Sequence, residues 1–170
     1  MAALTSAPSP RVPLVQPLGA MEVRFIDEGM GYDTLYDAGL ADRIGLVRQG
    51  LPAKVLTRMA GDMAIPRERL YAWLGIARTT ANRKVQAGEL LSQDDSERAL
   101  GIARLVGQVQ TVVAQSGAAE GFDAARWTAQ WLDEPNAALN GETPGSFMDT
   151  ADGRTLVASL VAQMQTGAYA

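Results

Sequence analysis

The chain has 170 residues, of which 47% are hydrophobic and 20% are charged, and its formal net charge is −4. This length and composition suit one moderate globular domain or two small domains packed together. Cysteine and histidine are both absent, which excludes disulfides, thiol nucleophiles, Cys/His zinc sites and the commonest general base. We therefore expect a protein that is not an enzyme and that holds neither a metal nor a cofactor.

Residues 1–30 are expected to form a flexible N-terminal arm, because Pro8, Pro10, Pro13 and Pro17 favour extended backbone. The arm has neither the basic start nor the unbroken apolar run of a signal peptide. No run of about eighteen apolar residues predicts a membrane span, so the cytoplasm is the expected location.

The charges are distributed unevenly along the chain. Residues 1–42 carry two basic and six acidic groups, residues 43–84 carry nine and two, and residues 85–170 carry four and eleven. The net charges of these segments are therefore −4, +7 and −7. A basic block between acidic flanks favours a phosphate-binding module, although a solvated basic face without a ligand would have the same composition.

Apolar residues at helical spacing predict a weak helix over 34–47, interrupted by glycines, and further helices over 52–63, 66–74 and 78–87. The last two are joined by a tight turn at Gly75, and the second is rich in Arg, Lys, Asn and Thr. This pattern is typical of a DNA-binding helix-turn-helix, whose second helix enters the major groove, but structural hairpins share it. The candidate DNA contacts are Arg67, Arg69, Arg78, Thr79, Thr80, Asn82, Arg83 and Lys84.

A capping box is indicated by Ser92 and Asp95, which predict the start of a long helix ending near Ser116. The apolar stripe of this helix is expected to pack in the core, and its width would also serve a homodimer along residues 100–113. The stripe consists of Leu100, Ala103, Leu105, Val106, Val109, Val112 and Val113.

The next helix is expected to begin at an Asp123 cap, with Phe122 and Trp127 as a hydrophobic staple, and to end near Asp133. Together with the segments that follow, it carries more large apolar residues than these short elements can bury among themselves. They need a further surface, which is either the rest of this chain or another protein. These residues are Trp127, Trp131, Phe147, Met148 and Leu160.

Near the end of the chain, Thr143-Pro144 predicts a single helical turn, and Asp149 or Thr150 caps a final helix that stops at Gly167. That helix has a narrow apolar stripe, consisting of Leu156, Val157, Leu160, Val161 and Met164. No strand is convincing anywhere, so the predicted fold class is all-α.

Several short motifs occur in a fixed order over residues 50–169. They are Gly50-Leu51-Pro52-Ala53, Leu74-Gly75-Ile76, Ala87-Gly88-Glu89-Leu90-Leu91-Ser92, Trp131-Leu132-Asp133-Glu134-Pro135-Asn136-Ala137-Ala138-Leu139, Thr143-Pro144, Asp149-Thr150, Gly153 and Gly167-Ala168-Tyr169. In this order the chain resembles the antitoxins of Xre–RES toxin–antitoxin pairs, the Xre/MbcA/ParS-type family.

The resemblance implies an Xre-like helix-turn-helix domain over residues 31–117 and a toxin-binding domain over 118–170. It implies a RES-domain toxin as partner, which degrades NAD or uses it to ADP-ribosylate a target, so that the NAD chemistry belongs to the toxin. It also implies homodimerisation, repression of the antitoxin's own operon, and a C-terminal tail at the toxin's active site. The candidate toxin contacts are Trp131, Asn136, Leu139, Phe147, Met148, Arg154, Leu156, Val157, Leu160, Met164, Gly167, Tyr169 and Ala170.

Three departures from the family pattern stand out. Ala77-Arg78 replaces a common Ser-Pro, so the second helix of the motif lacks a side-chain cap worth roughly 0.5–2 kcal/mol. Asn140-Gly141 replaces Gly-Gly, a mild change because Asn tolerates left-handed backbone. Gly145-Ser146-Phe147 replaces a more apolar turn.

Two functions fit these observations. The favoured one is an antitoxin that binds a RES-domain toxin and operator DNA. The alternative is a free-standing dimeric helix-turn-helix transcriptional regulator, whose C-terminal half only dimerises. For the final helix, closing the antitoxin's own core is the alternative to toxin binding.

Overall fold

The computed structural model describes residues 31–165, with side chains as far as Met164. The expected N-terminal arm and the candidate toxin contacts Gly167, Tyr169 and Ala170 lie outside the described residues.

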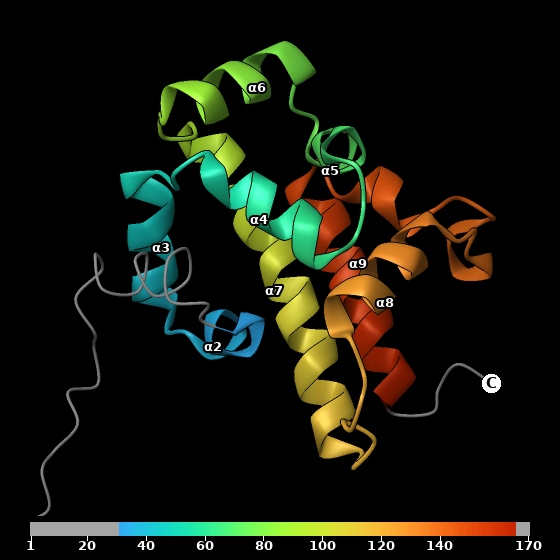
Figure 1. Ribbon diagram of the computed structural model, residues 1–170. Helices are drawn as coiled ribbons and strands as arrows, with labels where there is room; N and C mark the ends of the chain where they lie inside the picture. The colour runs from blue at the N-terminus through green and yellow to red at the C-terminus, as the bar shows by residue number, and fades with distance from the viewer. Residues whose placement is uncertain (1–30, 166–170) are drawn as a thin grey trace, which may run out of the picture.

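Figure 1 shows a bundle of helices. Its elements are α2 (Tyr32–Asp37), α3 (Leu40–Gln49), α4 (Lys54–Asp62), α5 (Arg67–Leu74), α6 (Arg78–Ala87), α7 (Gln93–Gln115), α8 (Ala124–Asp133), the 3-10 turns η1 (Ala137–Leu139) and η2 (Pro144–Phe147), and α9 (Ala151–Gln165). Strands are absent from residues 31–165, where Pro52 and Leu90 form an isolated bridge. The all-α prediction is therefore confirmed. Within the same range, none of the helices has the length and apolar character that crossing a bilayer requires.

The long helix α7 is the centre of the bundle. It packs against α2 and α3 on one side and against α8 and α9 on the other (Figure 1). The approach of α2 is very close at Gly107, where a Cβ would overlap the carbonyl oxygen of Tyr32. A glycine at this point of α7 therefore allows α2 to lie directly on it.

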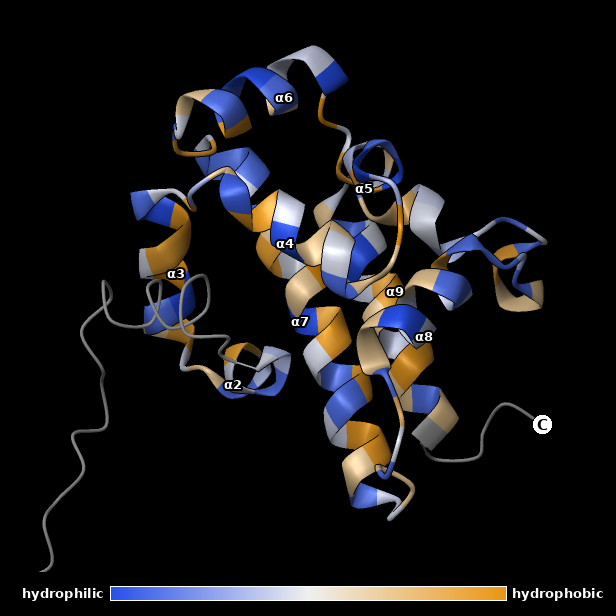
Figure 2. Cartoon of the chain, in the orientation of Figure 1, coloured by the Kyte–Doolittle hydropathy of each residue, from blue (hydrophilic) through white to orange (hydrophobic). Residues whose placement is uncertain are grey.

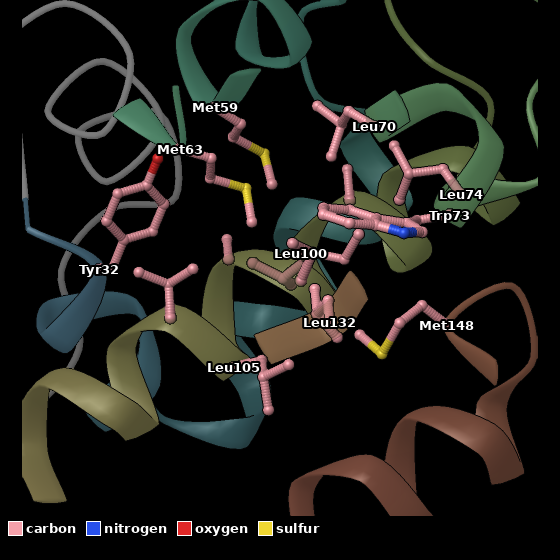
Figure 3. Close-up of a cluster of buried hydrophobic side chains, with 14 of the residues drawn as sticks. Tyr32, Met59, Met63, Leu70, Trp73, Leu74, Leu100, Leu105, Leu132 and Met148 are labelled. Carbon is pink, nitrogen blue, oxygen red and sulfur yellow. The ribbon is translucent and has the colours of Figure 1, made fainter. Parts of the chain in front are cut away.

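The hydrophobic core is continuous from α2 to α9 and does not divide between the two halves of the chain. In Figure 3, Trp73 of α5, Leu100 of α7, Leu132 of α8 and Met148 lie in one cluster. The rest of the chain buries Trp131, Met148 and Leu160 to 8% exposure or less. For these side chains, the missing surface is thus supplied by the protein itself.

The predicted caps largely match the structure. The Ser92 hydroxyl accepts a hydrogen bond from the Asp95 amide at 3.1 Å, and the Asp123 carboxylate accepts one from the Arg126 amide at 3.0 Å. At the start of α9, the Thr150 hydroxyl accepts from the Gly153 amide at 3.1 Å. Each helix therefore begins where its polar cap residue predicts.

The expected weak helix over 34–47 is wrong as a single element. The backbone is extended at Ala38 and Gly39, which separates α2 from α3. Arg43 stabilises this break, because its amide donates to the Gly39 carbonyl and its guanidinium donates to the Ala38 carbonyl. The break lets α2 and α3 pack on α7 in different directions.

Most of the stripe along α7 that was expected to serve a dimer is covered within the chain. Leu100, Val106 and Val109 are at most 5% exposed, because α2, α3, α8 and α9 of the same chain cover them. At the end of the stripe, Val112 and Val113 are half-buried, and the homodimer remains a prediction.

Candidate functional sites

The predicted helix-turn-helix is formed by α5 and α6. Gly75 ends α5 in the left-handed region with φ 63°, and the buried Ala81 anchors α6 to the body of the protein. The guanidinium of Arg98 on α7 donates to the Leu74 carbonyl at 2.7 Å, which satisfies a free helix end. The central helix α7 therefore fixes the turn between α5 and α6 through Arg98.

The helix α6 is mainly hydrophilic, as its largely blue ribbon in Figure 2 shows, and all its residues except Ala81 are exposed or half-buried. Arg78, Thr79 and Arg83 are exposed, whereas Thr80 and Lys84 are half-buried. Most of the candidate cations already have partners in the chain. Arg78 Nε lies 3.4 Å from Glu68 Oε1, Arg83 pairs with Glu89, and Lys84 Nζ donates to the Leu90 carbonyl at 3.0 Å.

These partners do not prevent phosphate binding. The side chains of Arg78 and Arg83 are 70% and 60% exposed, and ion pairs at such exposure stabilise a fold by only about 0–1 kcal/mol. A phosphate can therefore replace the carboxylate at low cost. Arg67 is also exposed on α5, while Arg69 pairs with Asp133 of α8 at 3.3 Å.

Asn82 has a structural contact inside the motif. The Tyr71 hydroxyl donates a hydrogen bond to Asn82 Oδ1 at 3.2 Å. Burial raises the pKa of Tyr71, and the opposing charge of Arg67 only partly offsets this, so the phenol stays protonated as the donor. Of the candidate DNA contacts, Asn82 is therefore the one most directly engaged in fixing α6 to α5.

The half that contains the helix-turn-helix and the C-terminal half meet around Trp73. This side chain is 5% exposed, and a Cβ at Gly145 would overlap its indole nitrogen and lie 2.8 Å from the Leu132 carbonyl. The ion pair between Arg69 and Asp133 crosses the same junction. The turn η2 is therefore fitted closely onto α5.

Six of the candidate toxin contacts lie in the core of the chain. Asn136 fixes the turn η1, since its side-chain oxygen accepts from the Ala138 amide at 2.9 Å. The others are apolar and at most 8% exposed. In this conformation such side chains hold the C-terminal half together, and they present little surface to a partner. The six are Trp131, Asn136, Leu139, Met148, Val157 and Leu160.

The remaining described candidates reach the surface to different degrees. Leu156 is 41% exposed on the outer side of α9, and Phe147 and Met164 are half-buried. Arg154 lies over Gly101 of α7, where its guanidinium is 3.2 Å from Glu97 Oε1 and donates to the Met148 carbonyl. Arg154 is thus a clamp between α9 and α7 as well as a candidate contact.

A groove at the far end of α9 was not predicted from the sequence. It has a volume of about 500 Å³ and is lined mainly by apolar side chains from α7, α8 and α9, among them Val113, Phe122, Trp127 and Met164. The predicted staple forms part of its wall, with Phe122 and Trp127 at 6.2 Å between ring centroids. The stacking of Trp127 on Trp131 at 5.9 Å extends this aromatic edge. The only signal in the sequence was the surplus of large apolar residues.

Comparison with known proteins agrees with this geometry. Residues 42–104 match the family model of the antitoxin Xre-like helix-turn-helix domain, and residues 118–167 match that of the antitoxin Xre/MbcA/ParS C-terminal toxin-binding domain. The chain is also 39% identical over 139 residues to the Prs ADP-ribosylating antitoxin of Sphingobium sp. (strain YBL2), covering 82% of this chain and 87% of that protein.

The chain belongs to the Xre/MbcA/ParS antitoxin family. It is therefore an antitoxin of a toxin–antitoxin system, with a helix-turn-helix domain and a toxin-binding domain. These two domains imply a toxin and DNA as its partners. The resemblance predicted from the ordered motifs is thus confirmed.

Proposed function

We propose that this antitoxin neutralises a RES-domain toxin by placing the residues that follow α9 in the toxin's active-site cleft. We propose further that it represses its own operon through α6. The observation that carries the first part is the division of α9 into two faces. Val157, Leu160 and Val161 are at most 4% exposed and face the core, whereas Leu156 is exposed.

This division limits where inhibition can come from. Because the inner face of α9 packs in the core, any toxin contacts of α9 itself come from its outer side and from the residues beyond Gln165. The toxin-binding match extends to residue 167, which includes the start of that tail. The aromatic ring of Tyr169 is of a kind that can occupy the place of an NAD base in a cleft.

The description of the Sphingobium relative refers to ADP-ribosylation. The family resemblance implies that a RES-domain partner either degrades NAD or transfers ADP-ribose. The description of this relative favours ADP-ribosyl transfer. The NAD would be held by the toxin, and the antitoxin would act by excluding it.

Removal of residues 166–170 tests the proposal. The described core ends before this segment, so the shortened antitoxin is expected to fold and to bind its toxin while the toxin regains activity. Tyr169→Ala should restore part of that activity, and Thr166→Ala serves as the matched control in the same tail. If the shortened antitoxin still suppresses the toxin fully, inhibition comes from another surface. Failure to copurify with the toxin encoded beside it would favour the free-standing regulator instead.

The second part of the proposal rests on the exposed cations of α6 and α5. Arg67, Arg78 and Arg83 are exposed within a segment of net charge +7, and a helix of this kind can enter a major groove. Replacing these cations should therefore weaken binding to the operon's own promoter DNA, which a titration of the labelled promoter fragment measures.

A further inference from the structure

A second groove, of about 700 Å³, lies between α3, α7 and α9. Its α3 wall includes Leu40 and Ile44, which are 67% and 42% exposed. They are two of the four large hydrophobic residues that are exposed in the described part of the chain. This groove thus leaves apolar surface in water on the antitoxin itself, which is unfavourable unless another segment covers it.

The same groove is strongly basic. Arg43, Arg48 and Arg104 line it, and none of them pairs with a carboxylate among the described residues. Glu97, which also lines the groove, pairs with Arg154 instead.

Arg104 is the least satisfied of these cations. Its Nε is buried and has no hydrogen-bond partner among the residues that the structure describes. Burial, and next the charge of Arg43, lower the pKa of Arg104. A partly buried cation beside a second cation is stabilised by an anion that can reach it. The groove therefore fits a ligand that is both apolar and acidic.

Such a segment precedes α2 in the same chain. Residues 22–28 read Glu-Val-Arg-Phe-Ile-Asp-Glu, with three acidic groups, one basic group and a central Phe25-Ile26 pair. We propose that this segment docks in the groove between α3, α7 and α9, with Phe25 and Ile26 on the apolar wall and Asp27 and Glu28 toward the arginines. Both family models begin after this segment, so its role goes beyond the proposed function.

The length of the chain allows this docking. Tyr36 of α2 lines the groove, and α2 begins at Tyr32. An extended chain covers roughly 3.3–3.6 Å per residue, so residues 28–31 span up to about 14 Å, more than the length of about 9 Å that six helical residues occupy. Asp27 and Glu28 can therefore pass α2 and reach the groove.

Other occupants fit less well. A nucleic acid would meet the arginines but would leave Leu40 and Ile44 without an apolar partner. A second copy docked symmetrically would bring the same arginines against each other across the two-fold axis, and like charges repel. Residues 22–28 supply both the apolar and the acidic component.

Trypsin provides a direct test in the full chain, because it cleaves after Arg24 inside the docking segment and after Arg11 outside it. The reference is the ratio of the two cleavage rates in a synthetic peptide of residues 1–30. We expect the ratio of the cleavage rate at Arg24 to that at Arg11 to be at least about fivefold lower in the full chain than in the peptide. Two partly exposed ion pairs and some apolar burial would stabilise the docked segment by about this factor. Raising the salt concentration should bring the ratio back toward the peptide value.

Two sets of variants identify the contacts. Asp27→Asn with Glu28→Gln should restore the peptide ratio without touching the folded core, when compared with a peptide carrying the same changes. Arg48→Gln with Arg104→Gln should do the same, whereas Arg67→Gln on the exposed side of α5 is the matched control and should not. If replacement of Arg104 disturbs folding, the variant that carries Asp27→Asn and Glu28→Gln still tests the proposal, because it leaves the folded residues unchanged.

Three results would overturn the proposal. The first is a ratio in the full chain equal to that of the peptide at low salt. The second is protection of Arg24 that appears only as the protein concentration rises, which would assign the groove to a second copy. The third is protection that requires the toxin or duplex DNA, which would assign it to that partner.

Discussion

The helices α6 and α9 carry the two proposed binding functions, and they are held in the protein in opposite ways. The helix α6 buries one residue, Ala81, and has no side-chain cap at its start. The helix α9 buries Val157, Leu160 and Val161 and is capped by Thr150. The exposed cations of α6 can therefore change with little effect on stability, whereas the buried face of α9 cannot.

The difference also explains where each function is placed. Because α6 is attached through one buried residue, its polar side chains are available to bind a ligand. Among them, Arg78, Thr79 and Arg83 are exposed. A helix that closes the core can serve a partner only through its outer side and its end. For α9 these are Leu156 and the residues after Gln165.

The largest expected effect comes from the inner side of α9. Leu160→Ala removes a side chain that is 4% exposed, and such truncations cost about 2–5 kcal/mol because a cavity is left. Leu156→Ala, four positions earlier on the same helix but 41% exposed, should cost less than about 1 kcal/mol. Urea unfolding of both variants measures the contrast. Equal losses of unfolding free energy would show that α9 does not have a core face and a free face.

The same pair separates stability from toxin binding. If Leu156 contacts the toxin, its replacement should weaken toxin binding although the protein remains stable. Leu160→Ala should weaken binding only to the extent that it unfolds the antitoxin. Toxin affinity measured well below the unfolding temperature of both variants distinguishes the two cases.

The next largest effect is expected at the junction of the two halves. In Gly145→Ala the new methyl group would overlap the Trp73 indole and lie 2.8 Å from the Leu132 carbonyl. Overpacking of this kind costs about 1–3 kcal/mol. Gly141→Ala is not a suitable control because its φ is 85°, so Ser146→Ala, an exposed neighbour, is used instead. An unfolding free energy unchanged by Gly145→Ala would mean that η2 can move away from α5 freely.

Much of this arrangement could be predicted from local sequence signals. Ser92 and Asp123 fix helix starts through contacts within one turn, and the motif of α5 and α6 depends on Gly75 and on the polar side chains near it. Asn140 has a φ of 56°, which agrees with the interpretation that Asn in place of a family Gly is a mild change because Asn tolerates left-handed backbone. These features need no knowledge of distant parts of the chain.

The features that failed depend on tertiary contacts. The stripe of α7 looked too wide for one chain because the sequence does not show that α2 lies across it at Gly107. The break between α2 and α3 is stabilised by the hydrogen bonds of Arg43 to the Gly39 and Ala38 carbonyls, which the spacing of apolar residues does not reveal. Likewise, the burial of Trp131 and Val157 could not be distinguished from a binding surface, because core and interface use the same residue types.

An intermediate effect is expected when the cations of α6 are removed. Replacing Arg78 and Arg83 with Ala should change the unfolding free energy by less than about 0.5 kcal/mol at each position, since both are exposed. Lys84→Ala also removes the hydrogen bond to the Leu90 carbonyl, which is worth about 0.5–1.5 kcal/mol. Binding to the operon's promoter DNA should weaken, and its dependence on salt should flatten by roughly one unit of slope for each phosphate that is no longer neutralised. Affinity measured between low and physiological salt tests this, and an unchanged slope would exclude α6 as the DNA-binding helix.

The sharpest comparison of the two helices comes from their caps. Ala77 has φ −61° and ψ 131°, the extended geometry of an N-cap residue, but it has no side-chain oxygen. Ala77→Ser should therefore stabilise α6 by about 0.5–1 kcal/mol, and Thr150→Ala should destabilise α9 by about 1 kcal/mol. Because α6 is fixed mainly by Ala81 and the bond between Tyr71 and Asn82, the new cap should also slow amide hydrogen exchange in its first turn. If DNA affinity rises with that protection, ordering of α6 limits binding. If exchange slows while affinity is unchanged, α6 is already ordered enough to bind, and the missing cap affects stability alone.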